Sequence, residues 1–115
     1  MGVSSNQLNN TNFTIMIIYN VTVLIDETVQ EEWLSWMKNI HIPEVMETGC
    51  FTEYRFCKIL AETEGGISYS IQYTSKNMET LDKYNAEFAP ALQEKHNAKY
   101  AGKFGAFRTL LEEVN

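Results

Sequence analysis

Apolar and polar side chains alternate with the two-residue period of a β-strand in several stretches of this chain. On this ground we predict strands over residues 16–25, 51–61, 67–74 and 104–112. The paired glycines Gly65-Gly66 between the second and third stretches predict a tight turn and therefore a hairpin. One face of each of the first three strands is expected to point inward: Ile17, Tyr19, Val21, Val23 and Ile25, then Tyr54, Phe56 and Leu60, then Ile67, Tyr69, Ile71 and Tyr73.

Between the first two strands the apolar residues repeat with the period of an α-helix, at Val29, Trp33, Trp36, Met37 and Ile40. Thr28 and Glu31 have the spacing of a capping box, which predicts that this helix begins at Thr28. Pro43 cannot continue a regular helix and pushes the preceding residue toward extended geometry, so we expect a bend at His41-Ile42. A short second helix should then begin at Pro43 and end at Gly49.

A second helical region follows the third strand, with its apolar stripe at Met78, Leu81, Tyr84 and Phe88. Ser75 and Asn77 are both suitable N-caps for it. A proline inside a helix costs about 3 kcal/mol, so we expect a kink or a break at Ala89-Pro90. A second helical piece over residues 90–100 should end at Gly102.

The resulting order is strand, helix, strand, strand, helix, strand, in one domain over residues 16–115. Right-handed crossovers then give an α+β, ferredoxin-like βαββαβ fold, in which both helical regions cover one face of a four-stranded antiparallel sheet. Residues 1–15 are rich in polar side chains without a period, and we expect a disordered lead-in there, with Met16 as the original start.

Composition and charge narrow the classes of partner. The 115 residues carry a net charge of −6, which disfavours a nucleic-acid partner because the phosphate backbone would be repelled. The sequence has no stretch of the roughly 20 apolar residues that span a bilayer and no secretory leader, so we expect no membrane association and a cytoplasmic location. Seven residues of strand would hold Cys50 and Cys57 about 23 Å apart, too far for a disulfide. The spacing of Cys and His residues supports no metal site, and we expect no cofactor.

The face of the sheet without helices mixes polar and apolar side chains. Its apolar members are expected to be Ile18, Leu24, Ile59 and Leu110. Its candidate binding residues are Asn20, Thr22, Arg55 and Gln72, together with Arg108, although the pattern of the last strand does not decide on which face Arg108 lies. This composition predicts a homodimer in which two such faces meet, and it allows a cleft for a small molecule between the two sheets.

Several motifs resemble those of a known superfamily. The run Trp36…His41-x-Pro43…Gly49 and the order of elements are similar to the dimeric α/β-barrel superfamily, with a weaker similarity to its EthD-like branch. A closer resemblance, over residues 16–114, is to a small bacterial family whose domain has no established biochemical role. That resemblance is carried by residues 19–22, 33–43, 88–92 and 107–111. It implies the fold and a sheet-to-sheet dimer; the superfamily includes cofactor-independent monooxygenases, isomerases and haem-degrading enzymes.

The candidate chemistry leaves two classes of function open. His41 would follow a helix C-terminus, where an imidazolium can cap free carbonyl groups, and this structural role is weighed above a catalytic one. His96 lies among polar helix residues and is interpreted as a surface side chain. Arg55 and Arg108 could bind a carboxylate or pair with acidic residues across a dimer. The chain is therefore expected to be a dimeric binding domain; the alternative is a small cofactor-independent enzyme, of monooxygenase or isomerase type, that acts on a hydrophobic compound.

Overall fold

The computed structural model describes residues 15–62 and 64–114 of the chain. The expectation of a disordered lead-in thus falls almost entirely outside the described residues. The elements in order are β1 (Ile17–Ile25), the 3₁₀ turn η1 (Glu27–Val29), α2 (Gln30–Trp36), the π-helical segment η2 (Met37–His41), α3 (Ile42–Glu47), β2 (Glu53–Lys58), β3 (Ile67–Ser75), α4 (Met78–Glu87), α5 (Ala89–Tyr100) and β4 (Phe104–Glu112).

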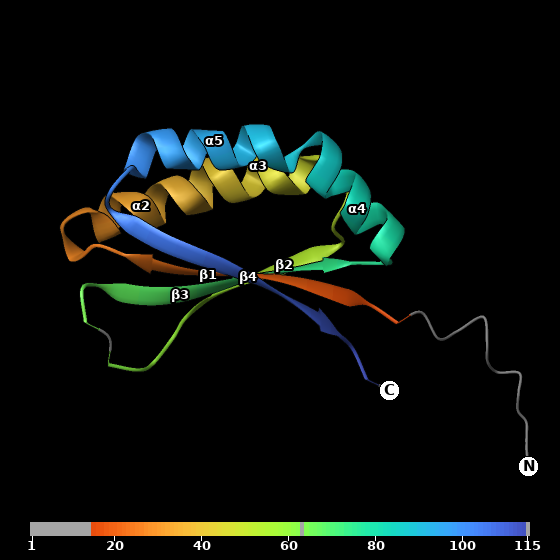
Figure 1. The fold of residues 1–115 in the computed structure, drawn as a ribbon, viewed down its shortest axis with the longest axis horizontal. Helices are drawn as coiled ribbons and strands as arrows, with labels where there is room; N and C mark the ends of the chain where they lie inside the picture. Colours follow the sequence, from red (N-terminus) through yellow and green to blue (C-terminus); the bar gives the residue numbers. More distant parts are fainter. Residues whose placement is uncertain (1–14, 63, 115) are drawn as a thin grey trace, which may run out of the picture.

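The four strands form one antiparallel sheet in the order β2-β3-β1-β4. Figure 1 shows α2, α3, α4 and α5 on one side of this sheet, with the other side bare. The predicted ferredoxin-like α+β fold is confirmed, including the open sheet face. Alternate side chains of each strand point to the helix face of the sheet, where the helices cover them. The sequence predicted correctly which residues of β1 and β3 these are.

The core lies between the helices and the sheet and is unusually rich in aromatic side chains. Its most completely buried members include Ile25, Trp33, Ile42, Ile71 and Leu81, each at most 1% exposed. Four of its aromatic rings form one cluster of stacked, tilted and edge-to-face contacts: Tyr19, Phe51, Tyr73 and Tyr84. Aromatic pairs of this kind add about 0.5–1.5 kcal/mol beyond their buried area.

The first helical region differs from the sequence prediction at its N-cap and at the expected bend. Asp26, rather than Thr28, provides the cap: its carboxylate accepts the Thr28 N–H at 2.8 Å and starts a 3₁₀ turn, so the predicted capping box does not form. The predicted bend at His41-Ile42 is also wrong, because Ile42 has helical φ and ψ of −62° and −43°.

A π-helical segment explains how the helix passes Pro43 without breaking. The Ile42 N–H donates to the carbonyl of Met37, five residues back, so the helix is wider here than an α-helix. Pro43 has no N–H to donate, and the wider π-helical turn directly before it accommodates the hydrogen bond that is missing there. The helix therefore continues from Gln30 to Glu47, and Gly49 follows it with a φ of +77° as predicted.

The second helical region agrees with the sequence. The Asn77 side chain caps α4 by accepting the Thr80 N–H at 2.7 Å, and the chain breaks at Phe88 before Pro90 as expected. The second strand is shorter than the predicted 51–61 at both ends, because it runs only from Glu53 to Lys58. Leu60 is therefore outside the sheet and 91% exposed, and Phe56 is the one residue of β2 that packs on the core.

Candidate functional site

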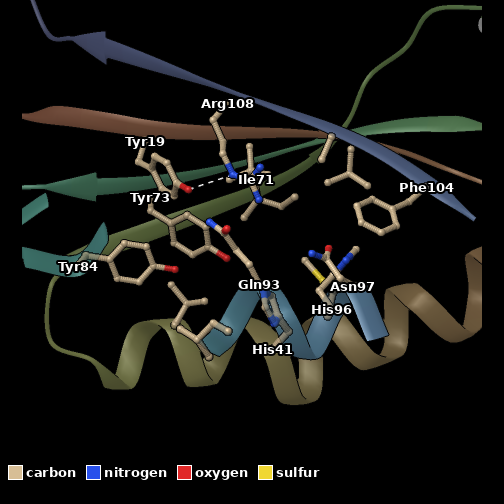
Figure 2. Close-up of a pocket in the computed structure, with 16 residues that line it drawn as sticks. Tyr19, His41, Ile71, Tyr73, Tyr84, Gln93, His96, Asn97, Phe104 and Arg108 are labelled. Atoms are coloured by element: carbon tan, nitrogen blue, oxygen red, sulfur yellow. Dashed lines mark hydrogen bonds between the residues drawn. The ribbon is translucent and has the colours of Figure 1, made fainter. Parts of the chain in front are cut away.

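A cavity of about 50 Å³ lies between the helices and the sheet, on the face opposite to the open one. Its floor is the sheet (β1, β3 and β4), and its roof is formed by the π-helical segment, α3, α4 and α5; Figure 2 draws the sheet above and the helices below. Apolar side chains make up much of the wall: Val21, Val23, Met37, Val45, Ile71, Leu92, Phe104 and Ala106. The polar lining is formed by Tyr19, His41, Tyr73, Tyr84, Gln93, His96, Asn97 and Arg108. Half of the lining residues are thus apolar and half carry a polar group, so a bound small molecule would meet both kinds of surface.

Both histidines of the chain meet in the roof of this cavity. Their ring centroids lie 5.8 Å apart, and the indole N–H of Trp33 donates to Nε2 of His96 at 2.9 Å. His96 is only 8% exposed, so the interpretation of His96 as a surface residue is wrong. His41 does not cap a helix end either, because it lies inside a continuous helix and stacks on Trp36 at 5.0 Å.

Burial keeps both imidazoles neutral near physiological pH. It lowers the pKa of His41 to about 4, with a smaller opposing contribution from the charge of Glu44. Burial likewise lowers the pKa of His96 to about 4, helped by the charges of His41 and Arg108. Because Nε2 of His96 accepts the Trp33 hydrogen bond, the proton of the neutral ring must be on Nδ1. Nδ1 of His41 is buried and has no hydrogen-bond partner among the described residues.

The sheet side of the cavity supplies a phenol and a guanidinium. Arg108 pairs with Val21 across β1 and β4, so its side chain lies on the helix face and not on the open face. Leu110 pairs with Tyr19 and shares that face, which corrects its assignment as well. The Nε–H of Arg108 donates to the Tyr19 hydroxyl at 3.2 Å (Figure 2). Burial raises the pKa of Tyr73 and of Tyr84, so these phenols stay protonated and can donate hydrogen bonds.

The six residues singled out from the sequence divide between the two faces of the sheet. His41 and Arg108 line the cavity, whereas Asn20, Thr22, Arg55 and Gln72 lie on the open face. There Ser70 donates to Oδ1 of Asn20 at 2.6 Å, and the Asn20 amide donates to the Thr22 hydroxyl at 3.1 Å. Gln72 lies between Asn20 and Arg55 in one row across the sheet.

The same division separates the residues that a haem-degrading site would need. A haem-degrading site would require an asparagine, an aromatic residue and a histidine that converge. Asn20 is separated from His96 and Tyr73 by the thickness of the sheet, so these residues do not fit a haem.

Sequence reasoning missed His96 as a site residue, although a signal was present. Leu92, His96 and Tyr100 are spaced four residues apart, and all three are buried on the inner side of α5. The alternation of β1 and β3 placed Tyr19 and Tyr73 toward the helices correctly. The alternation could not predict the cavity, because the cavity depends on how the helices pack over the sheet.

Within residues 15–62 and 64–114, no three His, Cys, Asp or Glu side chains are grouped closely enough to hold a metal ion. The described helices include none that is both long and apolar enough to cross a membrane. Cys50 and Cys57 are free thiols, the first buried and the second exposed.

Solved structures with this fold include several from the EthD and monooxygenase groups of the dimeric α/β-barrel superfamily. An EthD family protein from Bacillus halodurans is 15% identical, with a TM-score of 0.64 over 85% of this chain and 99% of its own. SnoaB from Streptomyces nogalater, a cofactor-independent oxygenase, is 11% identical, with a TM-score of 0.62 over 87% of this chain and 94% of its own. HapK from Hahella chejuensis is 9% identical, with a TM-score of 0.62 over 88% and 93% of the two chains. At these identities the likeness shows the fold alone.

No curated protein matches the sequence at a significant level. A family match is nevertheless clear, and it spans residues 16–114. The chain belongs to the family described as the domain of unknown function DUF4286.

Proposed function

We propose that this protein is a homodimeric domain that binds a small, largely apolar molecule in the cavity between its helices and its sheet. The observation that carries the proposal is the convergence of polar groups from opposite walls on one apolar chamber. The neutral His41 and His96 form the roof, and the paired Tyr19 and Arg108 form part of the floor. Such groups orient a ligand, while the apolar wall supplies most of the affinity.

The volume of the cavity limits the ligand. An engineered apolar cavity of about 150 Å³ binds benzene, and the volume here is about 50 Å³. A ligand with a small body fits as the side chains stand. A larger one requires side chains to move, and the exposed Asn97, whose side chain makes no hydrogen bond with the described residues, lines the cavity where such movement costs least.

The open sheet face supports the dimer in this proposal. Phe107 and Leu111 lie on it, 62% and 41% exposed, beside the hydrogen-bonded group formed by Asn20, Thr22 and Ser70. A strand face with this much exposed apolar surface favours a partner, and the relatives of this fold belong to a superfamily of dimers. Arg55 and Gln72 would then contact the partner rather than the ligand. The two free thiols fit a reducing compartment, and we propose the cytoplasm.

A cofactor-independent enzyme is the second candidate, and one observation favours it. Nδ1 of His41 is buried without a hydrogen-bond partner among the described residues, and the imidazole is neutral at pH 7; its pKa of about 4 makes it a weak base, so a catalytic role depends on its position against the bound molecule. A free imidazole in an apolar chamber can accept a proton from an acidic C–H group of a bound molecule. The phenol of Tyr19 and the guanidinium of Arg108 would stabilise the negative charge that develops on the adjacent oxygen.

Chemical-shift mapping tests the binding function. Uniformly ¹⁵N-labelled protein is titrated first with short aliphatic probes such as butyrate and butanone, and then with phenol, benzoate and acetophenone, which are larger than the cavity as it stands and require it to widen. We expect saturable shifts at cavity residues on β1, α5 and the π-helical segment, with no comparable shifts on the open face. Shifts that are absent, or confined to the open face, would refute the site.

Hydrogen–deuterium exchange tests the enzyme candidate separately. The methyl protons of acetophenone exchange slowly in D₂O, and an active-site base would accelerate this exchange. His41→Asn should abolish the acceleration while leaving the shift map of the bound probe in place. Equal exchange with and without the protein would leave the binding function and eliminate this catalytic one.

A further inference from the structure

The cavity carries one cation, and this cation has no acidic partner. The ion pairs within 4.0 Å among residues 15–62 and 64–114 join Lys95 to Glu44 and Lys99 to Glu32. Arg108 takes part in neither pair, and no Asp or Glu is among the residues that line the cavity. The protein has a net charge of −6. Most of the nine Lys and Arg residues are likewise outside these two pairs, so what distinguishes Arg108 is its position on the wall of the cavity.

The position of this guanidinium is fixed from one side. Its Nε–H donates to the Tyr19 hydroxyl, and Tyr19 is only 5% exposed. The Tyr19 ring stacks on Phe51 at 6.1 Å with an interplanar angle of 5°, and its edge-to-face contact with Tyr84 measures 5.9 Å. The terminal Nη groups of Arg108 are free to bind, and Figure 2 shows this side chain reaching from β4 into the space between Tyr19 and Gln93.

Tyr19 adds a second donor at the same place. Its oxygen accepts the Arg108 hydrogen bond, so its own proton is available to another acceptor. The guanidinium of Arg108 and the phenol of Tyr19 are thus neighbouring donors on the cavity wall, and a carboxylate, with its two oxygens, can accept hydrogen bonds from both. The remainder of the chamber, formed by Val21, Val23 and Ile71, suits a short apolar body attached to that anion.

Resting on the function proposed above, we propose that the ligand is a small monocarboxylic acid whose carboxylate binds Arg108 and Tyr19 and whose apolar body enters the cavity. A single guanidinium balances one negative charge. A phosphate monoester would bring close to two charges into a site with one cation, in a protein that is already acidic.

Matched pairs of probes test this inference. Butyrate is compared with butyramide, benzoate with benzamide, and inorganic phosphate serves as an anion without an apolar body. Binding is followed by the same ¹⁵N chemical shifts at pH 7. A hydrogen-bonded ion pair corresponds to at least about a tenfold difference in Kd, so each acid should bind about tenfold more tightly than its amide.

Two variants locate the effect. Arg108→Gln should bring the acid and the amide to equal affinity, and Arg108→Lys should keep part of the preference, because it retains the charge without the fork of donors. Lys58→Gln removes the same charge from an exposed position on β2 and should leave the preference unchanged. The amide cross-peak pattern of each variant reports whether it is folded.

The outcomes separate the two proposals. If acid and amide bind equally to the unmodified protein, or phosphate binds as tightly as benzoate, the carboxylate assignment is wrong while the binding site stands. If no probe of either kind shifts the cavity residues, the site itself is refuted. A preference for acids that persists in Arg108→Gln would also overturn the role of Arg108.

Discussion

Trp33 and His96 are 63 positions apart in the sequence and share a 2.9 Å hydrogen bond in the core. The bond joins α2 to α5 and fixes three things at once: the separation of the two helices, the orientation of the His96 ring and the nitrogen that carries its proton. Its partners are almost completely buried, with Trp33 at 0% and His96 at 8% exposure. The roof of the cavity therefore depends on a hydrogen bond between Trp33, a core residue that does not line the cavity, and His96, which does.

We predict that Trp33→Phe leaves Nε2 of His96 without its partner. An unsatisfied buried acceptor costs about 1–3 kcal/mol, and the smaller ring adds a packing loss, so unfolding in urea should shift to clearly lower concentration. Imidazole ¹⁵N spectra should show His96 losing its single tautomer. Trp36→Phe is the matched control, since it shortens a neighbouring indole without touching this bond. A pure Nδ1–H tautomer in Trp33→Phe would contradict the account.

The free energy of unfolding should decrease as the pH is lowered through the range between the unfolded and folded pKa values of His41 and His96. Each has a pKa near 6.5 in the unfolded chain and about 4 in the folded protein. A group whose pKa is lowered by folding contributes stability above its unfolded value, and this contribution is lost as the pH falls toward the folded value. We therefore expect the free energy of unfolding to decrease between about pH 6.5 and pH 4, by at most about 3 kcal/mol per histidine. The two losses are not additive, because each charge opposes the other.

Urea denaturation at half-unit pH steps measures this slope. His41→Asn and His96→Gln should each flatten it, whatever their stability at pH 7. A histidine whose Cε1–H resonance titrates in the folded protein at its usual pKa of 6.5 would show that burial does not govern it.

The order of the strands and helices could be predicted because the apolar period of an element and the residues that begin or end it are local features of the sequence. The alternation of Ile67, Tyr69, Ile71 and Tyr73 needs no knowledge of distant residues, and neither does the helix break before Pro90. The resemblance to a domain family of unknown function over residues 16–114 and the ferredoxin-like fold were both confirmed. The assignment of Arg108 was not predictable, because β4 is an edge strand whose residues are mostly exposed, and a mixed pattern does not set its register.

The candidate site was harder to predict because its residues are brought together by tertiary packing. Pro43 normally signals a helix end, and this rule misplaced His41. The π-helical segment removes the conflict by moving the hydrogen bond of Ile42 to Met37, and it leaves His41 inside the helix and against the cavity. No local pattern identified that adjustment, which π-helical insertions often provide at functional sites.

The two glycines between β2 and β3, Gly65 and Gly66, allow a prediction in which one substitution is the control for the other. A Cβ at Gly66 would lie 2.2 Å from the carbonyl oxygen of Ile25, whereas a Cβ at Gly65 would meet no atom within 4 Å. Gly65→Ala carries only the cost of its φ of +87°, about 1–2 kcal/mol. Gly66→Ala must also displace the backbone of β1, so it should be clearly the more destabilising of the two in urea denaturation. Equal losses would show that the turn moves away from β1 freely.

The open sheet face gives the last prediction, which concerns assembly rather than the cavity. Phe107 pairs with Thr22 across the sheet and is 62% exposed, so its ring is available to a second copy of the chain. Phe107→Glu would place a carboxylate there, and in a symmetric dimer each copy adds one charge to the same interface. Sedimentation velocity at micromolar concentration should show the unmodified protein as a dimer and Phe107→Glu as largely monomer, with little change in the unfolding midpoint of the monomer. Leu60→Glu is the control, because Leu60 is 91% exposed beyond the end of β2. An unmodified protein that sediments as a monomer would refute the dimer, and a dimer that survives Phe107→Glu would place its interface elsewhere.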